Sequence, residues 1–551
     1  MKRRKKPGTA RRKTDPAELT FFSNLFTSIA EEMGVTLART AYSPNIKERR
    51  DFSCGMFDSH GNMASQAAHI PVHLGAMPMS VAAAISRFGS LCEGDVVILN
   101  DPYSGGTHLP DITLVSPVIV QKTGLKRMNN NPIAFLVTRA HHADVGGMSP
   151  GSLPLSTEIY QEGLRIPPVK LIDAGTTNDA VLEIIKANSR TPDERIGDLR
   201  AQLAAHEVGS ARVREVIEKY SISTFTEQIK RLQWYGRRLM ESLIARIPDG
   251  SYRFKDRMDL SAQSGGDGAV KVNITVSGKK CRVDFTGSSR ESKQSLNAVE
   301  PVTRSAVYYC FLAILATPSR YQEEAAASPP LNGGCFFPIE ILAPKGSIVN
   351  ARPPCAVAAG NVETSQRIVD AVFGALSKAL PDIVPAASQG TMNNLTIGGR
   401  NPLTGKPFAY YETIGGGMGA RPTMDGLDGI QAHMTNTMNT PIEALEFAYP
   451  LRLERYEIRR GSGGIGKQRG GCGIRRELRA LCDATGTILG DRRTFAPYGL
   501  KGGRPGKPGQ DAVIRNGKVR PIASKSKLEL KAGDVISIRT PGGGGWGSKK
   551  S

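Results

Sequence analysis

The chain has 551 residues, which exceeds the size at which one hydrophobic core saturates, so two or three domains are expected. Hydrophobic residues make up 40% and charged residues 22% of the chain, as in a globular protein, and no apolar run reaches the roughly 18 residues that a membrane helix needs. No apolar segment follows the basic N-terminus, and the 8 cysteines include no C-x-x-C pair, so a soluble, reduced, cytoplasmic protein is predicted.

The positive charge is the second compositional feature. The formal net charge is +21, and a dense cluster of Lys and Arg lies in residues 1–14, which we predict to be a disordered basic tail. Much of the remaining excess is spread thinly, few aromatic residues are interleaved with it, and no nucleic-acid motif accompanies it. A surface suited to acidic metabolites or an acidic partner subunit therefore explains the charge better than nucleic-acid binding.

The N-terminal part predicts alternating helices and strands. Apolar residues at helical spacing indicate a helix over residues 15–42, and the alternating pattern of residues 51–58 indicates a strand that leads into a turn at 59–62. A second helix is expected over 75–88, followed by a short buried strand at 95–100. The region therefore has the pattern of a mixed helix and sheet domain.

Two further strands come next in the sequence. Residues 112–120 and 133–140 read as paired strands joined by a polar loop, so the residues just before the first and just after the second are expected to lie at adjacent strand ends. From 191 to 247 the apolar spacing is helical, with a break near Ser221, which predicts a helical hairpin.

The rest of the chain is richer in glycine and proline. We expect a hairpin over 270–285, helices over 298–316 and 362–380, and short strands alternating with glycine clusters beyond about residue 390. The predicted fold class is mixed α/β (α+β) with several domains. The expected divisions are an N-terminal α/β domain with the metal site and the helical hairpin at 15–250, a central α/β domain at 251–390, and a glycine-rich, β-containing C-terminal domain at 391–551.

The densest chemical signal lies between residues 100 and 147. Three of the 8 histidines fall here, in Gly106-Thr107-His108-Leu109-Pro110-Asp111 and in Arg139-Ala140-His141-His142-Ala143-Asp144. Imidazole nitrogen and carboxylate oxygen are ligands for Zn²⁺, Mn²⁺ or Fe²⁺. His108 and Asp111, three residues apart on a glycine-containing loop, are suited to converge on one cation.

This pattern leaves two candidates for the third ligand and two for the fourth. Either His141 or His142 is expected to bind, because adjacent residues of an extended segment face opposite ways, and either Asp51 or Glu48 is a candidate fourth ligand. Histidines that only satisfy backbone groups at strand ends are the alternative, but the grouping of three histidines with aspartates favours a metal site. Such a metal would polarise a carbonyl group or lower the pKa of bound water to about 7.

One glycine-rich segment matches two nucleotide motifs. Gly461–Lys467 matches G-x-G-x-x-G and the start of a phosphate loop, but Gln468 stands where Ser or Thr would hold Mg²⁺, and more glycines follow where a helix should begin. We therefore predict a connection between strands. Gly415–Gly419 is read as a tight turn or as cavity-lining backbone. Solvated loops account for the polar residues Glu412, Asn436, Asn439, Glu443 and Glu446.

Several motifs together carry a family resemblance. They are the segments 43–53, 69–75 (His69-Ile70-Pro71-Val72-His73-Leu74-Gly75), 100–103, 141–147, 435–443 and 462–471, with His108 and Asp111. In these the chain resembles the hydantoinase B/oxoprolinase family from about residue 15 to residue 547.

The resemblance implies a function and a partner. It implies the B-type subunit of an ATP-dependent amidohydrolase acting on hydantoins, 5-oxoproline or lactams, with a separate A-type subunit that binds ATP and phosphorylates the substrate oxygen. The family's metal ligands map by motif onto Asp51, His108, Asp111 and His141, with Glu48 and His142 in reserve.

The implied mechanism assigns roles to further residues. Metal-bound hydroxide is expected to attack the substrate that the A-type subunit has phosphorylated. Asp144 and His142 are the candidate catalytic residues, with Asp144 as the acceptor that orients His141. A subunit of an acetone or acetophenone carboxylase and a non-catalytic scaffold subunit are the alternatives.

Overall fold

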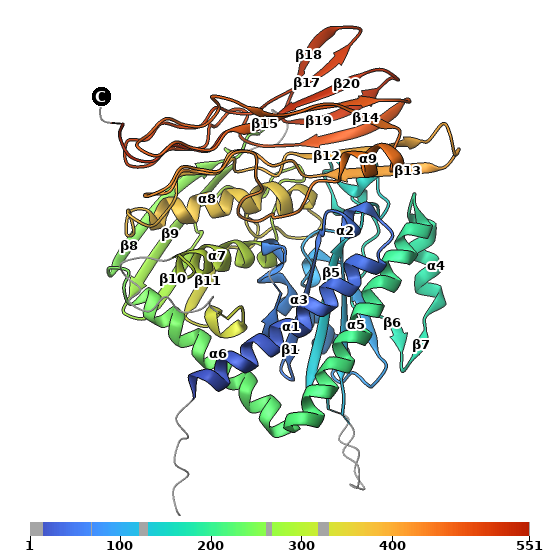
Figure 1. Cartoon of the computed structure of the whole chain (residues 1–551), viewed down its shortest axis with the longest axis vertical. Coiled ribbons are helices and arrows are strands. Elements are labelled where there is room, and N and C mark those ends of the chain that lie inside the picture. Colours follow the sequence, from blue (N-terminus) through green and yellow to red (C-terminus); the bar gives the residue numbers. More distant parts are fainter. Residues whose placement is uncertain (1–14, 68, 121–130, 261–266, 318–329, 550–551) are drawn as a thin grey trace, which may run out of the picture.

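The computed structural model describes residues 15–67, 69–120, 131–260, 267–317 and 330–549, so the predicted basic tail at residues 1–14 lies outside the described residues. Within them, helices pack against four sheets (Figure 1), which confirms the predicted mixed fold class.

The N-terminal sheet has seven strands among the described residues, and each neighbouring pair is antiparallel. In spatial order they are β2 (Met63–Gln66), β1 (Phe52–Asp58), β5 (Ala134–His141), β4 (Asp111–Val118), β3 (Val96–Leu99), β6 (Val169–Asp173) and β7 (Thr176–Thr177). The predicted strands near 112–120 and 133–140 are β4 and β5. Leu136 and Val137 on β5 belong to different hydrophobic clusters, because successive side chains point to opposite faces. This sheet is therefore buried on both sides.

Helices cover both faces of that sheet. On one face lie α1 (Pro16–Thr40) and α5 (Pro192–Tyr220), and on the other lies α3 (Ala76–Phe88) (Figure 1). The predicted helical hairpin is confirmed: α5 ends and α6 (Ile222–Ile244) begins on either side of Ser221, whose φ of 73° turns the chain. The short helices α2 (Pro44–Lys47) and α4 (Asp179–Asn188) complete this part.

A second, four-stranded sheet follows α6. Its spatial order is β11 (Ile339–Leu342), β10 (Lys280–Asp284), β9 (Ala269–Ser277) and β8 (Gly250–Arg257), and β9 and β10 form the predicted hairpin. Two helices accompany it, α7 (Glu300–Leu315) and α8 (Ser365–Leu376). The helix expected over 362–380 is thus shorter, and a π-helical turn, η6 (Gly360–Thr364), precedes it.

The C-terminal part forms the top layer in Figure 1 and contains two sheets. The first is β13 (Pro407–Glu412), β12 (Asn394–Arg400), β16 (Ala484–Leu489) and β19 (Lys525–Leu530). The second is β14 (Leu451–Arg459), β15 (Gly473–Ala480), β20 (Val535–Arg539), β17 (Gln510–Arg515) and β18 (Lys518–Ile522). A short helix, α9 (Ile442–Ala448), precedes β14. Among the described residues no helix is long and apolar enough to cross a membrane.

Glycine segments of this C-terminal part pack backbone against backbone. A Cβ atom on Gly417 would lie 2.0 Å from the carbonyl oxygen of Gly471, and one on Gly470 would lie 2.0 Å from that of Gly543. The Gly464 amide donates to the Gly543 carbonyl at 2.8 Å, so it is not available to a phosphate. The prediction of a connection between strands is confirmed, since residues 461–472 join β14 to β15.

The tight turn considered for Gly415–Gly419 is not what the structure shows. Gly416 forms an isolated β-bridge with Ile430, and Gly417 donates its amide to the Pro541 carbonyl at 3.0 Å. The segment is extended because its backbone forms hydrogen bonds with distant parts of the chain. The local sequence gives no sign of these partners.

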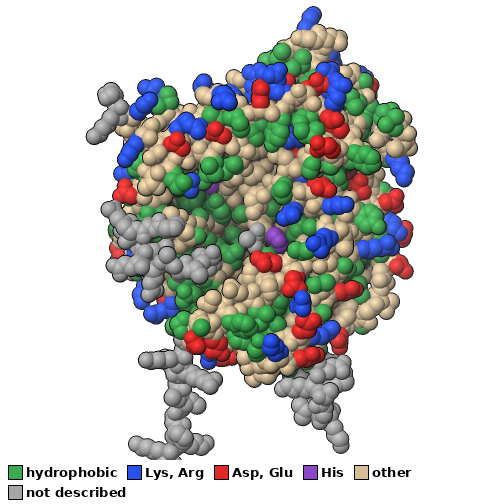
Figure 2. Space-filling model, in the orientation of Figure 1, with side chains coloured by type: hydrophobic (Ala, Val, Ile, Leu, Met, Phe, Trp, Pro, Cys, Tyr) green, Lys and Arg blue, Asp and Glu red, His purple; other side chains and the backbone are tan. Residues whose placement is uncertain are grey.

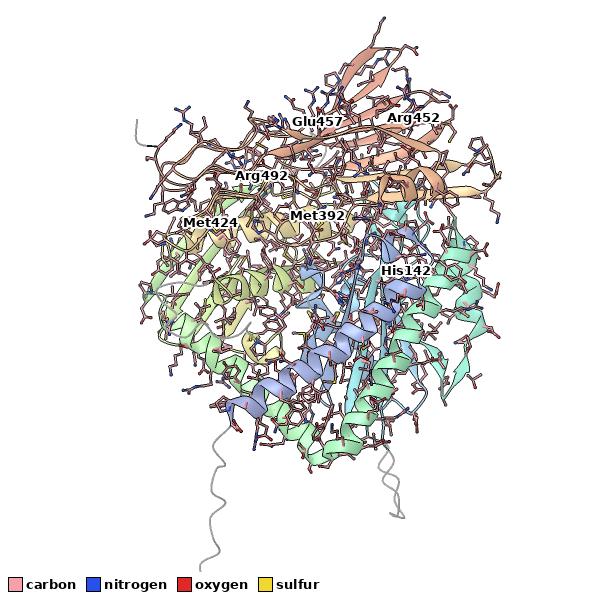
Figure 3. The ribbon with its side chains drawn as sticks, in the orientation of Figure 1. His142, Met392, Met424, Arg452, Glu457 and Arg492 are labelled. Atoms are coloured by element: carbon pink, nitrogen blue, oxygen red, sulfur yellow. The ribbon has the colours of Figure 1, made fainter. Side chains whose placement is uncertain are left out.

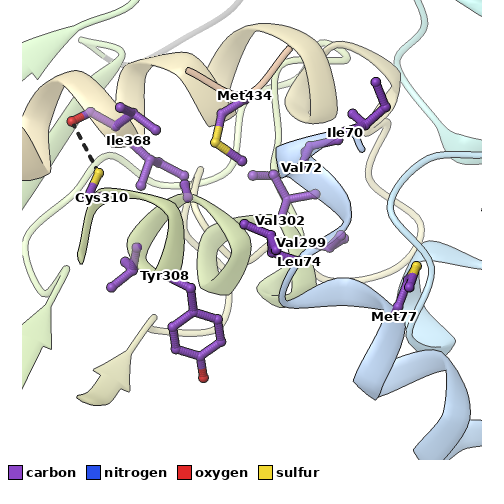
Figure 4. Close-up of a cluster of buried hydrophobic side chains, with 14 of the residues drawn as sticks. Ile70, Val72, Leu74, Met77, Val299, Val302, Tyr308, Cys310, Ile368 and Met434 are labelled. Carbon is purple, nitrogen blue, oxygen red and sulfur yellow. Dashed lines mark hydrogen bonds between the residues drawn. The ribbon is translucent and has the colours of Figure 1, made fainter. Parts of the chain in front are cut away.

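The largest hydrophobic cluster combines residues from all three expected domains. Figure 4 shows part of it: Ile70 and Val72 before α3, Val302 of α7 and Met434 from the C-terminal part belong to the same cluster. The domain boundaries expected at 250 and 390 stay predictions. The shared core contains residues from both sides of each expected boundary.

The outer surface is mixed in charge on the face that Figure 2 shows. Lys and Arg side chains alternate there with Asp and Glu, and hydrophobic side chains lie between them. On this face the positive charge is therefore distributed over the surface and does not form one continuous patch.

Candidate metal centre

The start of β4 and the end of β5 bring Asp111 and His141 together. The two residues are direct partners in the antiparallel register, and Nδ1 of His141 lies 3.2 Å from Oδ1 of Asp111. His108 reaches the same oxygen from the loop before β4, with its Nε2 atom 3.1 Å from Oδ1. The two imidazole nitrogens are 3.2 Å apart. All three side chains are buried.

The triangle of donor atoms has the size that a metal ion requires. Zn²⁺ binds nitrogen and oxygen ligands at about 2.0–2.2 Å, which separates neighbouring ligand atoms by roughly 3.0–3.5 Å in tetrahedral or octahedral geometry. The observed separations of 3.1 and 3.2 Å fall in this range. Because Nδ1 of His108 faces the Ala358 carbonyl oxygen at 3.2 Å, it must carry the proton when the ring is neutral, which leaves Nε2 free to bind a cation.

The electrostatics of these side chains favour a positive ligand. Burial opposes ionisation of Asp111, but the charge and hydrogen bond of His108, followed by hydrogen bonds from His141 and His73, hold the pKa of Asp111 well below its usual range. Burial lowers the pKa of His141. Burial by itself would lower the pKa of His108, but the charge and hydrogen bond of Asp111, together with the Ala358 carbonyl and the charge of Asp51, raise it. A buried carboxylate beside imidazoles is the donor set of metal sites.

The second oxygen of Asp111 is held by three other side chains. The Thr107 hydroxyl donates to Oδ2 at 2.5 Å, the amide of Asn361 donates at 3.4 Å, and Nε2 of His73 lies at 3.4 Å. Nδ1 of His73 in turn contacts the hydroxyl oxygen of Ser53 at 2.8 Å. These contacts orient the carboxylate so that Oδ1 faces the two other histidines.

His73 and Asn361 are functional candidates that the sequence reasoning did not select as site residues. His73 lies in the motif 69–75 that carried the family resemblance, and the scarcity of histidine in this chain was a signal that could have identified it. Asn361 follows Asp111 by 250 residues, and no local pattern links them.

Asp51 and Glu48 differ in their relation to the centre. Asp51 lines the same cavity as Asp111 and His141, and its carboxylate lies 4.0 Å from the guanidinium of Arg49. It is outside the compact group formed by His108, Asp111 and His141. Glu48 is half-buried and does not line this cavity.

His142 points away from the triangle, as expected for the neighbour of His141 in an extended segment. Its Nε2 atom contacts Oε1 of Gln202 on α5 at 3.0 Å, and burial lowers its pKa to about 4. The structure therefore brings His141, and not His142, to Asp111.

Asp144 does not make the expected contact with His141. Its carboxylate pairs with the guanidinium of Arg190 at 3.0 Å and accepts backbone amides from Gly146 at 3.1 Å and Gly151 at 3.3 Å. The expectation was wrong in its geometry because the chain turns after His142, so that Asp144 organises the following loop.

A small cavity of about 20 Å³, enough for about one water molecule, adjoins the triangle. Its lining combines distant parts of the chain: Asp51, Ile70, Val72, His73, Asp111, His141, Asn361, Val362, Met392, Tyr411, Thr413, Met434, Thr435 and Thr437. Figure 3 shows Met392 just below the C-terminal strands, with His142 lower in the same view. The cavity therefore lies where the C-terminal layer meets the N-terminal sheet.

Tyr411 forms part of one wall of this cavity, and Arg49 contacts the Tyr411 ring. The rings of Tyr411 and His141 are stacked, with centroids 4.5 Å apart and an angle of 18° between their planes. The buried guanidinium of Arg49 lies 4.8 Å from the centre of the Tyr411 ring and donates to the Thr413 hydroxyl at 2.8 Å. The Thr413 and Thr437 hydroxyls are hydrogen-bonded at 2.7 Å.

Glu412 next to this wall is not in a solvated loop, as the sequence suggested. It is buried, pairs with Arg476 at 2.6 Å, and accepts hydrogen bonds from the Asn439 side chain at 3.0 Å and the Thr440 amide at 2.8 Å. These contacts fasten the segment that carries Thr435 and Thr437 over the cavity.

The fold and the site together define a protein with a candidate His/Asp metal centre between its N-terminal sheet and its C-terminal strands. The family model described as hydantoinase B/oxoprolinase matches residues 15–549, and the chain belongs to this family.

Relatives of this chain include an uncharacterised protein and proteins named as enzymes or enzyme subunits. The chain is 42% identical to an uncharacterised protein of Methanocaldococcus jannaschii, over 94% of this chain and 88% of that protein. It is 37% identical to 5-oxoprolinase 1 of Arabidopsis thaliana, over 97% of this chain but only 42% of that longer protein. It is 31% identical to a putative D-/L-hydantoinase subunit of the B type from a Pseudomonas species, over 98% of this chain and 90% of that protein.

Two solved structures share the fold. The ATP-dependent caprolactamase of Pseudomonas jessenii superposes with a TM-score of 0.86 at 26% identity, covering 97% of this chain and 91% of that chain. An acetone carboxylase has the same TM-score of 0.86 at 20% identity and covers 97% of this chain and 76% of that chain, which shows likeness of fold alone.

Proposed function

We propose that this chain is the B-type subunit of an ATP-dependent cyclic amide hydrolase that opens hydantoin, 5-oxoproline or lactam rings together with an A-type subunit. The observation that carries the proposal is the buried triangle of His108, Asp111 and His141 beside a cavity, in a chain of this family. The similarity to a caprolactamase and to a putative hydantoinase subunit supports the substrate class.

In this proposal His108, Asp111 and His141 hold a divalent cation, and Asp51 in the same cavity is the further ligand. Zn²⁺, Mn²⁺ and Fe²⁺ all suit such donors. The bound cation would supply Lewis acidity that polarises the substrate and makes water more acidic. Thr107 and His73 hold the other oxygen of Asp111 and keep the carboxylate in place.

The reaction requires ATP because a ring amide is a poor electrophile. The A-type subunit transfers the γ-phosphoryl group of ATP to the amide oxygen, which leaves ADP and a phosphorylated ring with a protonated carbon–nitrogen double bond, so the nitrogen keeps its hydrogen. Water adds to the ring carbon, and the carbon–nitrogen bond then breaks, with its electron pair and a proton passing to nitrogen. A second water releases phosphate from the resulting acyl phosphate. One ring amide, one ATP and two waters thus yield an open-chain amino acid, ADP and phosphate.

The side chains around the cavity position the reacting groups. Stacking of Tyr411 on His141 restricts rotation of that imidazole, and the guanidinium of Arg49 partly balances the buried charge of Asp51. The apolar side chains Ile70, Val362 and Met392 exclude bulk water from the cavity. The site is therefore suited to add a single water molecule to an activated ring carbon.

An A-type partner is part of the proposal because phosphorylation needs a nucleotide site. The Pseudomonas relative named as a subunit is matched over 90% of its length, whereas the Arabidopsis enzyme is more than twice as long as the part matched. The glycine-rich segment 461–472 uses its amides, such as those of Gly464 and Lys467, for backbone hydrogen bonds.

The test is to purify the chain with its A-type partner and to measure ADP and ring-opened product with a panel of lactams, hydantoins and ketones, with and without bicarbonate. We expect ring opening coupled to ATP hydrolysis and independent of bicarbonate. Product formation only from ketones and bicarbonate would assign a carboxylase instead. A complex that binds metal but converts none of these compounds would contradict the proposal.

A matched pair of histidine variants makes this test specific to the site. His108→Ala is expected to abolish ring opening with the complex still assembled, because it removes one corner of the triangle. His60→Ala, an exposed histidine in the turn between β1 and β2, is expected to retain wild-type turnover. Equal activity in both variants would rule out the assigned centre.

A further inference from the structure

Asn361 presents an unsatisfied hydrogen-bond acceptor to the cavity. Its side chain is buried and lines the cavity, and its Nδ2 atom donates to Oδ2 of Asp111 at 3.4 Å. Because a carboxylate only accepts hydrogen bonds, this contact fixes which end of the amide is nitrogen. Its Oδ1 atom has no hydrogen-bond partner among the described residues. Buried polar atoms without partners are rare and point to a missing ligand or water.

The position of Asn361 is fixed by the helix start that carries it. It lies in the π-helical turn η6, a feature that often occurs at functional sites. A Cβ atom on Gly360 would lie 1.8 Å from the Asn297 carbonyl oxygen, so the turn is pressed against that backbone. The carboxylate of Glu162 accepts the amides of Val357 and Ala358 at 2.9 and 3.0 Å and anchors the same turn.

A second unsatisfied atom complements this acceptor. Nε2 of His141 is also buried without a hydrogen-bond partner among the described residues, and His141 lines the same cavity. Asn361 contacts Oδ2 of Asp111, whereas His141 contacts Oδ1. When Nδ1 of His141 faces a cation, the proton of the neutral ring is on Nε2, which then donates. The cavity thus offers one acceptor and one donor, fixed on either side of a single carboxylate.

We propose that Oδ1 of Asn361 accepts a hydrogen bond from the N–H of the ring amide that is opened. This inference rests on the proposed function and names the feature of the substrate that the cavity selects. An amide inside a small ring is cis, so its N–H and its oxygen lie along one edge, and Asn361 and His141 offer one acceptor and one donor to such an edge. Asn361 is a specificity-determining residue in this role, and it keeps the proton on the nitrogen that must leave as an amine.

The proposal has a consequence for substrate choice. A ring amide with a methyl group on the reacting nitrogen has no hydrogen to donate, and a ketone has no nitrogen at that position. A site built around a buried polar group rejects an analogue that lacks the matching group, because its own group is then left unpaired. Substrates with N–H are therefore expected to be preferred over both.

The test compares matched substrates in the complex with the A-type partner. With pyrrolidin-2-one and 1-methylpyrrolidin-2-one, or the best ring amide of the panel and its N-methyl analogue, we expect kcat/KM of the wild type to favour the N–H compound by about 100-fold or more. Asn361→Ala and Asn361→Ser are expected to reduce this ratio to below about 10, mainly through loss of activity on the N–H compound. Asn332→Ala, a buried asparagine outside the cavity, is expected to keep the wild-type ratio.

A binding measurement gives a readout that does not require turnover. Ligand-observed NMR of the complex with a non-hydrolysable ATP analogue yields dissociation constants for the same two compounds. Tighter binding of the N–H compound by the wild type, lost in the Asn361 variants, supports the proposal. An unchanged ratio in a folded Asn361 variant, in either assay, overturns it. Absence of ring opening by the wild type would refute the proposed function, while the binding ratio would still decide the role of Asn361.

Discussion

Asp111 and His141 face each other across the antiparallel pair β4 and β5, and the His141 Nδ1 atom lies 3.2 Å from the Asp111 Oδ1 atom. They are thirty positions apart in the sequence, but the strand pairing brings them next to each other in space. His108 completes the arrangement because it lies in the loop that leads into β4, three residues before Asp111. A rigid, doubly covered sheet thus holds two of the three donors, which is the kind of support that a precise metal site needs.

Removing the charge of Asp111 is expected to remove metal binding. Asp111→Asn keeps the shape of the side chain but neutralises the only carboxylate of the compact group. We expect bound Zn²⁺ or Mn²⁺ per chain, measured by mass spectrometry of the elements after desalting, to fall at least about tenfold. Metal at 100 times its dissociation constant should stabilise the wild type by about 2.7 kcal/mol, seen as a rise in Tm that the variant lacks.

The exposed Asp173 provides the control for that variant. Asp173→Asn should leave the metal content unchanged, because this carboxylate pairs with Lys170 at the surface. Full metal loading of Asp111→Asn would mean that the cation is held elsewhere.

The aromatic ring of Tyr411 is expected to matter more than its hydroxyl group. Stacking on His141 is worth about 0.5–1.5 kcal/mol, which corresponds to roughly a two- to tenfold effect. Tyr411→Phe keeps the ring and loses the hydrogen bond to Asn394 at 3.1 Å, whereas Tyr411→Leu loses both. We expect kcat of Tyr411→Phe to stay near the wild-type value and that of Tyr411→Leu to fall two- to tenfold or more. The reverse order would show that the hydroxyl group is the functional part.

Substitutions at two glycines are expected to show that one of them is required for close backbone packing and the other is not. In Gly470→Ala the new Cβ atom would lie 2.0 Å from the Gly543 carbonyl oxygen, so the packed glycine segments must move apart. We expect a loss of about 1–3 kcal/mol or more, measured as a lower midpoint of thermal unfolding. Gly461→Asn should be tolerated within about 0.5 kcal/mol, because this position has open space and a φ of 69° that asparagine accepts.

Glu363 is expected to make stability depend on pH. Burial, followed by the charge of Asp491, raises its pKa to about 8 from an ordinary value of 4.5. The folded state therefore retains a proton that the unfolded state releases between pH 4.5 and pH 8, so the stabilising contribution is greatest at low pH and is lost as pH rises through this window. The sign follows because the native state binds more protons there.

Glu363→Gln isolates this effect. The variant keeps an oxygen that can accept from the Met392 amide, as Oε1 does at 3.1 Å, and cannot ionise. We expect the Tm of the wild type to fall between pH 6 and pH 9 relative to that of the variant. Parallel Tm curves over this range would show that Glu363 is not protonated in the folded state.

Much of the N-terminal half was predictable from local pattern. Alternating and helical spacing indicated β4, β5 and the helical hairpin, and the clustering of scarce histidines indicated the site. The rule that neighbours in an extended segment face opposite ways correctly separated His141 from His142. The interpretation of Gly461–Lys467 as a connection between strands was also confirmed, because the residues after it are unsuited to begin a helix.

Other features could not be predicted because they depend on contacts between distant segments. The Asp144 carboxylate pairs with Arg190, 46 residues later, and not with His141. Glu412 is buried because Arg476 lies beside it, on a strand of a different sheet. The pattern of a single sequence does not indicate which charged residues far apart in the chain form ion pairs.

The sequence by itself determined the types of the candidate ligands, their loop and strand positions and the family, because these depend on residue identity and short spacing. The tertiary structure alone decided that Asn361, Tyr411 and Thr437 line the same cavity as Asp111. The physical reason is that burial of one continuous core brings the three parts of the chain together, and a side chain acquires its partners, its pKa and its role only in that packed state.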